Sequence, residues 1–594
     1  MRKKFLAMFS LMLMMVFAIT LCFADNPIVQ TIYTADPAPM VYNGTCYVYT
    51  GHDADTLVNN FFTMNDWRCY ASTDMVNWTD LGSPLSYAAF SWAKGDCWAG
   101  QCIYRNGKFY YYVPLTQKTG GMAIGVGVST NPAGPFADAL GHPLVYTGTG
   151  DIDPTVFIDD GGQAYLYWGN PNLWYVKLNQ DMISYSGSPV QIPLTTASFG
   201  VRSNSDRPTQ YEEGPWFYKR SGLYYMVFAA GPISEHISYS TSTGPTGPWT
   251  FRGVIMPTQG GSFTNHPGVI DYNGNSYFFY HNGALPGGGG YHRSVCVEKF
   301  TYNADGTIPT INMTTSGPSQ IGNLNPYVQT EAETICWESG VETESCSEGG
   351  MDVGYIENGD YIKVKGVNFD SGATSFDARV ASANSGGNIE IRLDSLTGTL
   401  VGTCAVQGSG GWQNWVTQSC SVSNVTGIHD LYFKFTGGSG YLFNFNWWKF
   451  NSGTSTPTPT PGSYVRLLNV ATSLSIDGMG STANGSNACQ WGNSGNTNQQ
   501  WTIIDSGGYR IIQNRATGLY LDGMGRTANG SICGQWGYSG SANQQWTQET
   551  AGSYVRFKNR ATGLYLDGMG STGNGSDLCQ WSNSGSTNQQ WEIQ

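Results

Sequence analysis

The stretch VFIDDGGQAYLYW, residues 156–168, joins two apolar residues to a glycine turn and an aromatic strand, and this unit recurs in the first half of the chain. The other copies are MVYNGTCYVY (40–49), CIYRNGKFYYYV (102–113), WFYKRSGLYYMVF (216–228) and VIDYNGNSYFFY (269–280). Their turn glycines are 63, 55, 60 and 52 residues apart, at Gly44, Gly107, Gly162, Gly222 and Gly274. A multi-strand repeat of about 57 residues is typical of propeller blades. We therefore predict a five-bladed β-propeller over residues 25–313.

The residues just before each apolar pair are candidates for a site, because the innermost strands of all blades meet at the propeller axis. Those positions hold Asp36, Asp96, Asp153, Glu213 and His266. Proline follows three of these acids, directly or after one glycine, which is also ordinary turn chemistry. Recurrence in phase with the repeat favours a shared site instead. Glycoside hydrolysis needs one protonated acid at the leaving oxygen and one carboxylate that activates water, so these acids predict a glycosidase.

With these residues the N-terminal region resembles glycoside hydrolase family 43, whose members are inverting enzymes built on five-bladed propellers. The resemblance implies that Asp36 is the general base and that Glu213, rather than its neighbour Glu212, is the general acid. It assigns Asp153 to orienting the acid and raising its pKa. It further implies that His266 helps to hold a central calcium through water, and that Arg293 in GYHRSVCVEKF contacts the substrate beside the acid.

The longer stretch from Gly51 to Gly82 resembles the arabinoxylan arabinofuranohydrolase branch of that family. Its Asp53, Trp67 and Trp78 are expected to pack within the blade, as are Phe61 and Phe62 except that one of these two, with Phe61 preferred, is expected to contact substrate. The resemblance implies an exo-acting enzyme that removes α-L-arabinofuranosyl groups from arabinoxylan. A β-1,4-xylosidase of the same family would use identical acids. A non-catalytic adhesin is a more distant alternative, since a binding protein needs no acid and base pair.

Residues 327–450 contain alternating apolar strands such as YIKVKGV and NIEIRLD between glycine and serine turns, which predicts a β-sandwich. The segments EAE (331–333), NGDYIKV, GGWQNW and FNFNWWKF resemble carbohydrate-binding module family 6. The resemblance implies a sugar cleft formed by Tyr361, Trp412 and Asn444, and a structural calcium site that includes Glu331 and Glu333. Asn446 stands where the family often has an aspartate ligand.

The last third repeats with a period of 45 residues, as at Tyr464, Tyr509 and Tyr554, and a Pro/Thr-rich linker (451–463) precedes it. Three such units predict a β-trefoil over residues 464–594. The motif NQQW in every copy resembles ricin-type lectin domains, also called carbohydrate-binding module family 13. We expect its final tryptophans to form the core. The resemblance implies three sugar sites, at Asp477, Trp491 and Asn498, at Asp522, Trp536 and Asn543, and at Asp567, Trp581 and Asn588.

Residues 1–24 predict a secretory signal, because three basic residues precede an apolar run that ends at Cys22-Phe23-Ala24. We expect a secreted monomer with no membrane segment after the signal is removed. Twelve further cysteines lack any C-x-x-C pair, which disfavours zinc and favours disulfides outside the cell. Cys336 with Cys346 and Cys404 with Cys420 are near enough in sequence to pair locally.

The composition excludes several partners. The formal net charge of −13 repels phosphate backbones and so disfavours nucleic acid. Only 12% of residues are charged, whereas 36 tyrosines and 19 tryptophans suit neutral sugars, whose apolar faces stack on rings. The chain has no phosphate loop, H-E-x-x-H or G-x-S-x-G motif. We therefore expect plant cell-wall polysaccharide (arabinoxylan or xylan) as the partner, calcium as a structural ion and no organic cofactor.

Overall fold

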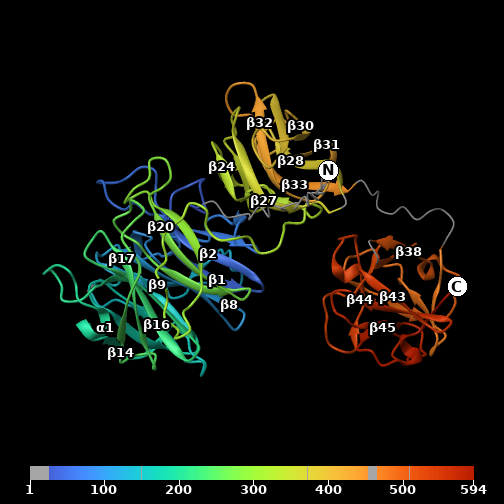
Figure 1. Ribbon diagram of the computed structural model, residues 1–594, viewed down its shortest axis with the longest axis horizontal. Coiled ribbons are helices and arrows are strands. Elements are labelled where there is room, and N and C mark those ends of the chain that lie inside the picture. The colour runs from blue at the N-terminus through green and yellow to red at the C-terminus, as the bar shows by residue number, and fades with distance from the viewer. Residues whose placement is uncertain (1–25, 149, 371, 453–463, 507–508) are drawn as a thin grey trace, which may run out of the picture. The chain divides into compact units, whose positions relative to one another are not determined.

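The computed structural model describes residues 26–594 except 149, 371, 453–463 and 507–508, so the predicted signal and nearly all of the linker lie outside the described residues. The described part is almost entirely β-structure, with a single four-residue α-helix, α1 (Thr196–Phe199). None of its helices has the length and apolarity of a membrane span. The chain divides into two compact units, residues 1–451 and 452–594 (Figure 1).

Five antiparallel sheets confirm the predicted five-bladed propeller. The first four blades are β1–β5 (Thr34–Tyr42, Thr45–His52, Asp66–Ser72, Trp78–Asp80, Leu85–Ser86), β6–β10 (Ala93–Gly95, Gln101–Arg105, Lys108–Gln117, Met122–Ser129, Ala137–Asp138), β11–β14 (Thr155–Ile158, Ala164–Trp168, Trp174–Leu178, Tyr185–Gln191) and β15–β18 (Tyr211–Arg220, Leu223–Ala230, His236–Ser242, Thr250–Met256). The fifth is β19–β21 (Gly268–Tyr272, Asn275–Asn282, Ser294–Phe300). In blade 1 the turn residues Asn43 and Gly44 have φ of 48° and 77°, the left-handed pair that a two-residue hairpin requires.

The N-terminal segment closes the propeller, since the fifth blade has only three strands. Ile28 donates its N–H to the carbonyl of Val295 at 2.9 Å. The amide group of Asn26 exchanges two hydrogen bonds with the backbone of Val297, each 3.1 Å long. Asn26 also donates to the Glu298 carboxylate at 3.1 Å, which accepts the hydroxyl of Tyr280 at 2.9 Å. Residues 26–34 therefore extend blade 5 along β21.

Residues 330–452 form the predicted sandwich of two antiparallel sheets. One sheet contains β22 (Thr330–Glu331), β25 (Glu342–Ser345), β26 (Met351–Gly354), β28 (Ala373–Ala381), β31 (Val416–Val425) and β33 (Asn444–Ser452). The other contains β24 (Trp337–Ser339), β27 (Tyr361–Asn368), β29 (Gly386–Leu393), β30 (Leu400–Gln407) and β32 (Ile428–Gly437). Buried aromatic rings, among them Phe433 and Trp448, whose centroids are 5.3 Å apart, fill the space between the sheets.

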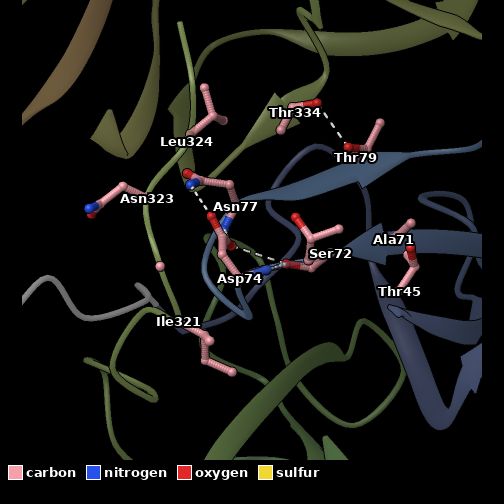
Figure 2. A pocket seen from close by; sticks show the side chains of 12 residues that line it. Thr45, Ala71, Ser72, Asp74, Asn77, Thr79, Ile321, Asn323, Leu324 and Thr334 are labelled. Atoms are coloured by element: carbon pink, nitrogen blue, oxygen red, sulfur yellow. Dashed lines mark hydrogen bonds between the residues drawn. The ribbon is translucent and has the colours of Figure 1, made fainter. Parts of the chain in front are cut away.

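The sandwich is joined to blade 1 of the propeller by a continuous polar and apolar junction. Strand β23 (Thr334–Ile335) pairs with β4, and the hydroxyls of Thr79 and Thr334 lie 2.8 Å apart. The amide group of Asn77 accepts the Lys365 N–H at 2.8 Å and donates to the Lys365 carbonyl at 2.9 Å. Figure 2 shows Asn77 and Thr79 beside a pocket of about 340 Å³ at this junction. The propeller and the sandwich are therefore joined by backbone and side-chain hydrogen bonds at this junction.

The C-terminal unit is the predicted β-trefoil, with three lobes of short strands. They are β34–β38 (Leu467–Asn469, Ser475–Asp477, Ser486–Asn487, Cys489–Trp491, Trp501–Ser506), β39–β43 (Tyr509–Asn514, Tyr520–Asp522, Ser531–Ile532, Gly534–Trp536, Trp546–Ala551) and β44–β48 (Tyr554–Asn559, Tyr565–Asp567, Ser576–Asp577, Cys579–Trp581, Trp591–Ile593). Trp501, Trp546 and Trp591 are fully buried in one cluster, which confirms their predicted place in the core. Each indole N–H donates to a carbonyl of its own lobe, at Ile476, Leu521 and Leu566.

The predicted disulfides are not formed. All twelve cysteines of the described part are free thiols. Cys336, one of the four cysteines expected to pair locally, packs against Val76 of the propeller instead. Cys404 and Cys420 alone follow the expectation in part, because their side chains interact across neighbouring strands β30 and β31.

We predict that Asn77→Ala lowers the free energy of unfolding by about 2 kcal/mol, since it removes the side-chain acceptor of the buried Lys365 N–H and one of the donors to the Lys365 carbonyl, which keeps its bond from Gln320. Asn323 is exposed beside the same pocket, so Asn323→Ala should change stability by less than about 0.5 kcal/mol. Chemical denaturation of both variants measures the difference. Equal effects would mean that the junction contributes nothing through Asn77.

Candidate active site

The axis of the propeller carries the predicted carboxylates, and a histidine stands between them. A narrow axial cavity is lined by residues from all five blades, at 36–38, 99–101, 153–154, 214–216 and 266–267. The ring of His266 faces the Asp36 carboxylate through Nδ1 at 3.4 Å and the Glu213 carboxylate through Nε2 at 3.3 Å. Asp153 Oδ2 lies 4.0 Å from Nε2. Four of the five residues predicted from the repeat therefore meet at one site.

Asp36 is held as a buried carboxylate with cationic and neutral donors around it. Arg293 Nη1 donates to Oδ1 of Asp36 at 2.9 Å. The backbone N–H of Asp36 donates to Nδ1 of His281 at 3.2 Å. Burial and the neighbouring Arg293 and His266 keep the pKa of His281 well below its usual value, so that ring is neutral and its Nδ1 accepts. The backbone of Asp36 is left-handed, with φ of 53°, a conformation that aspartate tolerates better than most residues. Arg293 and His281 therefore fix the side chain and the backbone of Asp36 in place.

Glu213 is the most accessible acid of the cluster. Its side chain is 17% exposed, compared with 3% for Asp36 and 4% for Asp153. Asn170 donates to its Oε2 at 2.5 Å. The neighbouring Glu212 points elsewhere and pairs with Arg202 at 2.6 Å and with Arg207 at 2.8 Å. Strand alternation thus sends Glu213 alone to the axis.

The electrostatics of the cluster differ from the sequence-based expectation. Burial raises the pKa of Asp153 to about 7, and the negative charges of Glu213 and Asp36 add to this effect. The His266 ring acts in the opposite direction but does not outweigh them. Burial also disfavours ionised Glu213, but hydrogen bonds from His266 and Asn170 outweigh it and lower the pKa of Glu213. Burial would lower the pKa of His266, but the three carboxylates raise it to about 10. Asp153, not Glu213, is therefore the carboxyl whose pKa is raised, and it is about half protonated at pH 7.

One further expectation is corrected and one is made more specific. Asp96 does not reach the axis, because its carboxylate accepts the Thr116 hydroxyl and blade 2 contributes residues 99–101 there instead. A Cβ on Gly100 would lie 2.8 Å from the Tyr112 carbonyl, so only glycine fits that position. Arg293 makes its direct bonds to the predicted base Asp36 and to Asp53, the latter through Nε at 2.9 Å and Nη2 at 2.8 Å, and it interacts with the acid Glu213 through its charge.

Sequence reasoning missed four residues of this site. Asp53, expected only to pack within blade 1, is fully buried and fixes Arg293, while His281 and Asn170 support Asp36 and Glu213. Glu235 is buried behind the cluster, where burial and the charge of Glu213 raise its pKa well above the usual value. His281 ends the aromatic strand of the fifth repeat, so position in the repeat could have found it. The other three lie in loops without a periodic signal.

An aromatic cluster borders the site. Phe62 lies under the Arg293 guanidinium, with the ring centroid 4.6 Å from the guanidinium carbon. The ring of Phe62 contacts Tyr291 at 4.8 Å, Phe263 at 5.9 Å and Trp98 at 6.3 Å. Phe61 packs on Phe62 at 5.1 Å and is 48% exposed, as a residue that contacts substrate would be. The predicted residue therefore belongs to a wall of aromatic rings beside the carboxylates.

The axial residues can hold a metal ion. Donor atoms of Asp153, Glu213 and His266 lie within 4.8 Å of one another, and among the described residues they form the one such set of side chains. Calcium takes six to eight oxygen ligands, so two carboxylates and a ring nitrogen fit it only if water supplies the rest. Both nitrogens of His266 also face carboxylates. The geometry thus suits a hydrated cation better than a directly enclosed one.

In the sandwich, Asn444 shares a partner with the chain neighbour of Trp412, whereas Tyr361 lies on the other sheet. Asn444 and Gln413 both donate to Glu344, and Gln413 adjoins Trp412 in the chain. Tyr361 lies on the other sheet, where its ring contacts Tyr432 at 6.1 Å. The correction follows from the turn at 355–360, which carries the chain from one sheet to the other.

Tyr355 takes the place expected for Tyr361. It follows β26 directly, is exposed, and meets the exposed Tyr441 edge-on at 5.7 Å. Its left-handed φ of 57° turns it out of the strand. The backbone carbonyl of Tyr441 accepts a hydrogen bond from the Asn384 side chain. Two residues earlier, the Ser382 carbonyl accepts from the backbone of residues 409–411, the loop that precedes Trp412. In the sequence, the only sign of this alternative was that Tyr355 lies six residues before Tyr361.

Glu331 and Glu333 are the predicted metal ligands of the sandwich. Among the described residues, they do not form a cluster with a third donor side chain close enough to bind the same ion. Glu331 is half-buried on β22 and accepts from Gln329, whereas Glu333 is buried with an Oε2 that lacks a hydrogen-bond partner. Burial and the nearby acids Glu331, Asp80 and Asp352 raise the pKa of Glu333 well above its usual value. Asn446 donates to Glu348 instead of facing these acids. An unpartnered oxygen at Glu333 fits a cation, but a complete ligand set is not in place.

In each trefoil lobe the predicted aspartate lies beside the predicted asparagine. Asp477, Asp522 and Asp567 are buried, and each accepts the N–H of the second residue after it at 2.6–2.7 Å. The turn after each aspartate contacts the asparagine of its own lobe, Asn498, Asn543 or Asn588. Trp491 and Trp581 are half-buried and Trp536 is 40% exposed. All three predicted sets are thus brought together.

A propeller with an axial cluster of carboxylates beside an aromatic wall defines a glycosidase-type site, and comparison with known proteins agrees. The sequence profile of glycosyl hydrolases family 43 matches residues 24–308. The profile of carbohydrate binding module family 6 matches residues 331–452, and that of ricin-type beta-trefoil lectin domains matches residues 446–536 and 542–594.

The chain is 36% identical to an arabinoxylan arabinofuranohydrolase of Bacillus subtilis, over 72% of this chain and 92% of that protein. It is 34% identical to an arabinoxylan arabinofuranohydrolase of Paenibacillus polymyxa, over 72% and 75%. A crystal structure of the glycoside hydrolase family 43 arabinoxylan arabinofuranohydrolase from Bacillus subtilis with cellotetraose superposes with a TM-score of 0.63, covering 72% of this chain and 97% of that one at 34% identity. The chain therefore belongs to glycoside hydrolase family 43.

We predict a pH-dependent stability effect of Asp153→Asn. Because the pKa of Asp153 is about 7 in the fold and near 4 in the unfolded chain, the folded parent keeps this proton longer and loses stability as pH rises between those values. The variant has no such proton, so its stability relative to the parent should rise by up to about 1.4 kcal/mol per pH unit from pH 4 to 7.

Denaturation curves at several pH values measure this trend, with Asp305→Asn as the control. Hydrogen bonds from Thr307 lower the pKa of Asp305, so its carboxyl is ionised in both the folded and the unfolded state above about pH 5.5. The control should show no trend above that pH. A flat difference for Asp153→Asn would mean that Asp153 is ionised in the fold.

Proposed function

We propose that the protein is a secreted enzyme that removes α-L-arabinofuranosyl side groups from arabinoxylan by inverting hydrolysis. The observation that carries this proposal is the placement of Asp36 and Glu213 on opposite sides of the His266 ring at the propeller axis. Two arabinoxylan arabinofuranohydrolases that match across the propeller and the sandwich support the choice of substrate.

Asp36 acts as the general base. Its contacts with Arg293 and His266 hold the carboxylate in a fixed position, where it can accept a proton from water. The contacts on the two sides of the imidazole leave the Asp36 and Glu213 carboxylates at most about 9 Å apart, which is compatible with the roughly 6.5–9.5 Å that accommodate a water in inverting glycosidases. Asp53 acts through Arg293 as a positioning residue.

Glu213 acts as the general acid, because it is the acid of the cluster that a substrate can reach. Without substrate the pKa of Glu213 is lowered, so binding of the substrate has to raise this pKa before Glu213 can donate a proton. A neutral sugar over Glu213 excludes water from a carboxylate that is already largely buried, and desolvation raises a carboxyl pKa. Asp153, with its pKa near 7, supplies a nearby protonated carboxyl in the same cluster.

The aromatic wall favours a polymer side group over a free chain end. Phe61, Phe62 and Tyr291 present ring faces and edges beside the carboxylates, where the apolar faces of backbone xylose units could stack. A β-1,4-xylosidase remains the alternative, since the same acids would serve it. An adhesin lacks a reason to hold Asp36 and Glu213 at this spacing.

The remaining parts of the proposal concern targeting and ions. The sandwich and the trefoil would bind xylan-type polysaccharide through Tyr355, Trp412 and Asn444 and through the three trefoil sets. Calcium would be held at the axis by His266 through water, where its positive charge would help to keep the carboxylates ionised. Secretion rests on the basic and apolar pattern of residues 1–24.

We predict that Asp36→Asn reduces turnover on wheat arabinoxylan at least about 10²-fold, because an amide of the same shape cannot take a proton from water. Asp96→Asn is a matched control, since Asp96 also has a left-handed backbone (φ of 60°, against 53° for Asp36) but lies off the axis. The control should keep near-parental turnover. Near-parental turnover in Asp36→Asn would remove the proposed base.

Product analysis on wheat arabinoxylan tests the substrate assignment. Chromatography of the released sugars should give free arabinose and no free xylose from the parent enzyme. Xylose from xylo-oligosaccharides would favour the xylosidase. No sugar from either substrate would favour the adhesin.

A further inference from the structure

Three short turns of the trefoil, residues 483–486, 528–531 and 573–576, share an Asn-Gly-Ser sequence that the candidate sugar sites do not use. We call them the Asn-Gly turns. Each leads into a short strand that pairs with a neighbouring lobe rather than with its own. Ser486 pairs with Gln535, Ser531 with Gln580 and Ser576 with Gln490. Each glutamine directly precedes a candidate sugar-stacking tryptophan.

At Trp491 the Asn-Gly turn of the third lobe holds the backbone on both sides of the ring. Gly575 donates its N–H to the Gln490 carbonyl at 2.9 Å, and Asn574 Oδ1 accepts the N–H of Gly492 at 2.7 Å. Gly575 itself lies against the indole, because a Cβ there would be 3.4 Å from Cζ3 of Trp491. Its φ of 85° is also one that glycine adopts readily.

The same three contacts occur at the other two tryptophans. At Trp536, Gly485 donates to the Gln535 carbonyl at 2.9 Å, Asn484 accepts from Gly537 at 2.7 Å, and a Cβ on Gly485 would be 3.3 Å from Cζ3. At Trp581, Gly530 donates to the Gln580 carbonyl at 2.9 Å and Asn529 accepts from Ser582 at 2.7 Å. A Cβ on Gly530 would be 3.5 Å from Cζ3. The first lobe thus holds the tryptophan of the second, the second that of the third, and the third that of the first.

We propose that every sugar site of the trefoil is shared by two lobes: one lobe supplies the aspartate, tryptophan and asparagine, and its neighbour supplies the Asn-Gly turn that fixes the tryptophan. This inference rests on the proposed polysaccharide-binding function of the trefoil. Because the glycine meets the indole at Cζ3, the part of the ring surface away from that atom is left for a sugar ring. A ring fixed before binding loses less conformational entropy on association, so Asn484, Asn529 and Asn574 are positioning residues for affinity.

The sharing has a direction, and this makes it testable with the full-length chain. A variant with Asp522→Ala and Asp567→Ala keeps only the site of Trp491, which depends on Asn574. A variant with Asp477→Ala and Asp567→Ala keeps only the site of Trp536, which depends on Asn484. The triple variant lacking all three aspartates measures the binding that the propeller and sandwich contribute. Affinity electrophoresis through soluble wheat arabinoxylan compares all of them.

In the first background Asn574→Ala should weaken the trefoil contribution about threefold to tenfold, the usual worth of one neutral hydrogen bond, and Asn484→Ala should not. In the second background the two effects should exchange. Asn574→Asp keeps an acceptor oxygen for the Gly492 N–H and should retain binding. The melting temperatures of Asn574→Ala and Asn484→Ala should agree, since the two residues make equivalent contacts.

Equal weakening in both backgrounds, or none in either, would overturn the sharing while leaving the trefoil a sugar-binding domain. Backgrounds that migrate like the triple variant would show that the lobes do not bind this polysaccharide. That result removes the proposed function of the trefoil, and the shared site with it.

Discussion

The convergence of three carboxylates on one imidazole is the constraint on which the catalytic domain depends. Four blades deliver Asp36, Asp153, Glu213 and His266 to the axis, and such charges cannot be buried together without compensation. Arg293 and the His266 ring supply it, and Asp153 supplies the rest by keeping a proton near neutral pH. Closure of the ring by residues 26–34 is what holds these blades at a fixed spacing, since Thr34 donates to the carbonyl of Arg293 itself.

Much of this arrangement follows from the sequence because it is periodic. The hairpin turns repeat with the blades, so the residues that precede them identify the axial positions of blades 1, 3, 4 and 5. Blade 2 breaks the rule, because its chain runs three residues past Asp96 before a glycine fits against the Tyr112 carbonyl. Asp53 and Arg293, which are 240 residues apart, form an ion pair that no local pattern announces. The proton on Asp153 rather than Glu213 is likewise a property of the assembled cluster.

The binding domains repeat the same lesson. The resemblance implied Tyr361 beside Trp412 and Asn444, but the chain crosses between the sheets before Tyr361, and it is Tyr355, six residues earlier, that lies exposed at the end of β26. In the trefoil the family resemblance implied the aspartate, tryptophan and asparagine of one set, and the 45-residue period repeats that set in all three lobes. The period treats each lobe as complete, however, and so conceals the contacts by which one lobe supports the tryptophan of the next. The sandwich, joined to blade 1 through Asn77, is also less separable than its sequence boundaries suggest.

The anomeric configuration of the first sugar released from wheat arabinoxylan tests the account most directly, because it reports which carboxylate does what. Attack by a water that Asp36 activates, from the face opposite the bond that Glu213 protonates, inverts the anomeric centre. Proton NMR during the first turnovers should therefore show the β-anomer of arabinofuranose before mutarotation. First appearance of the α-anomer would mean that a carboxylate attacks the sugar itself, and would contradict the assignment of Asp36 as base.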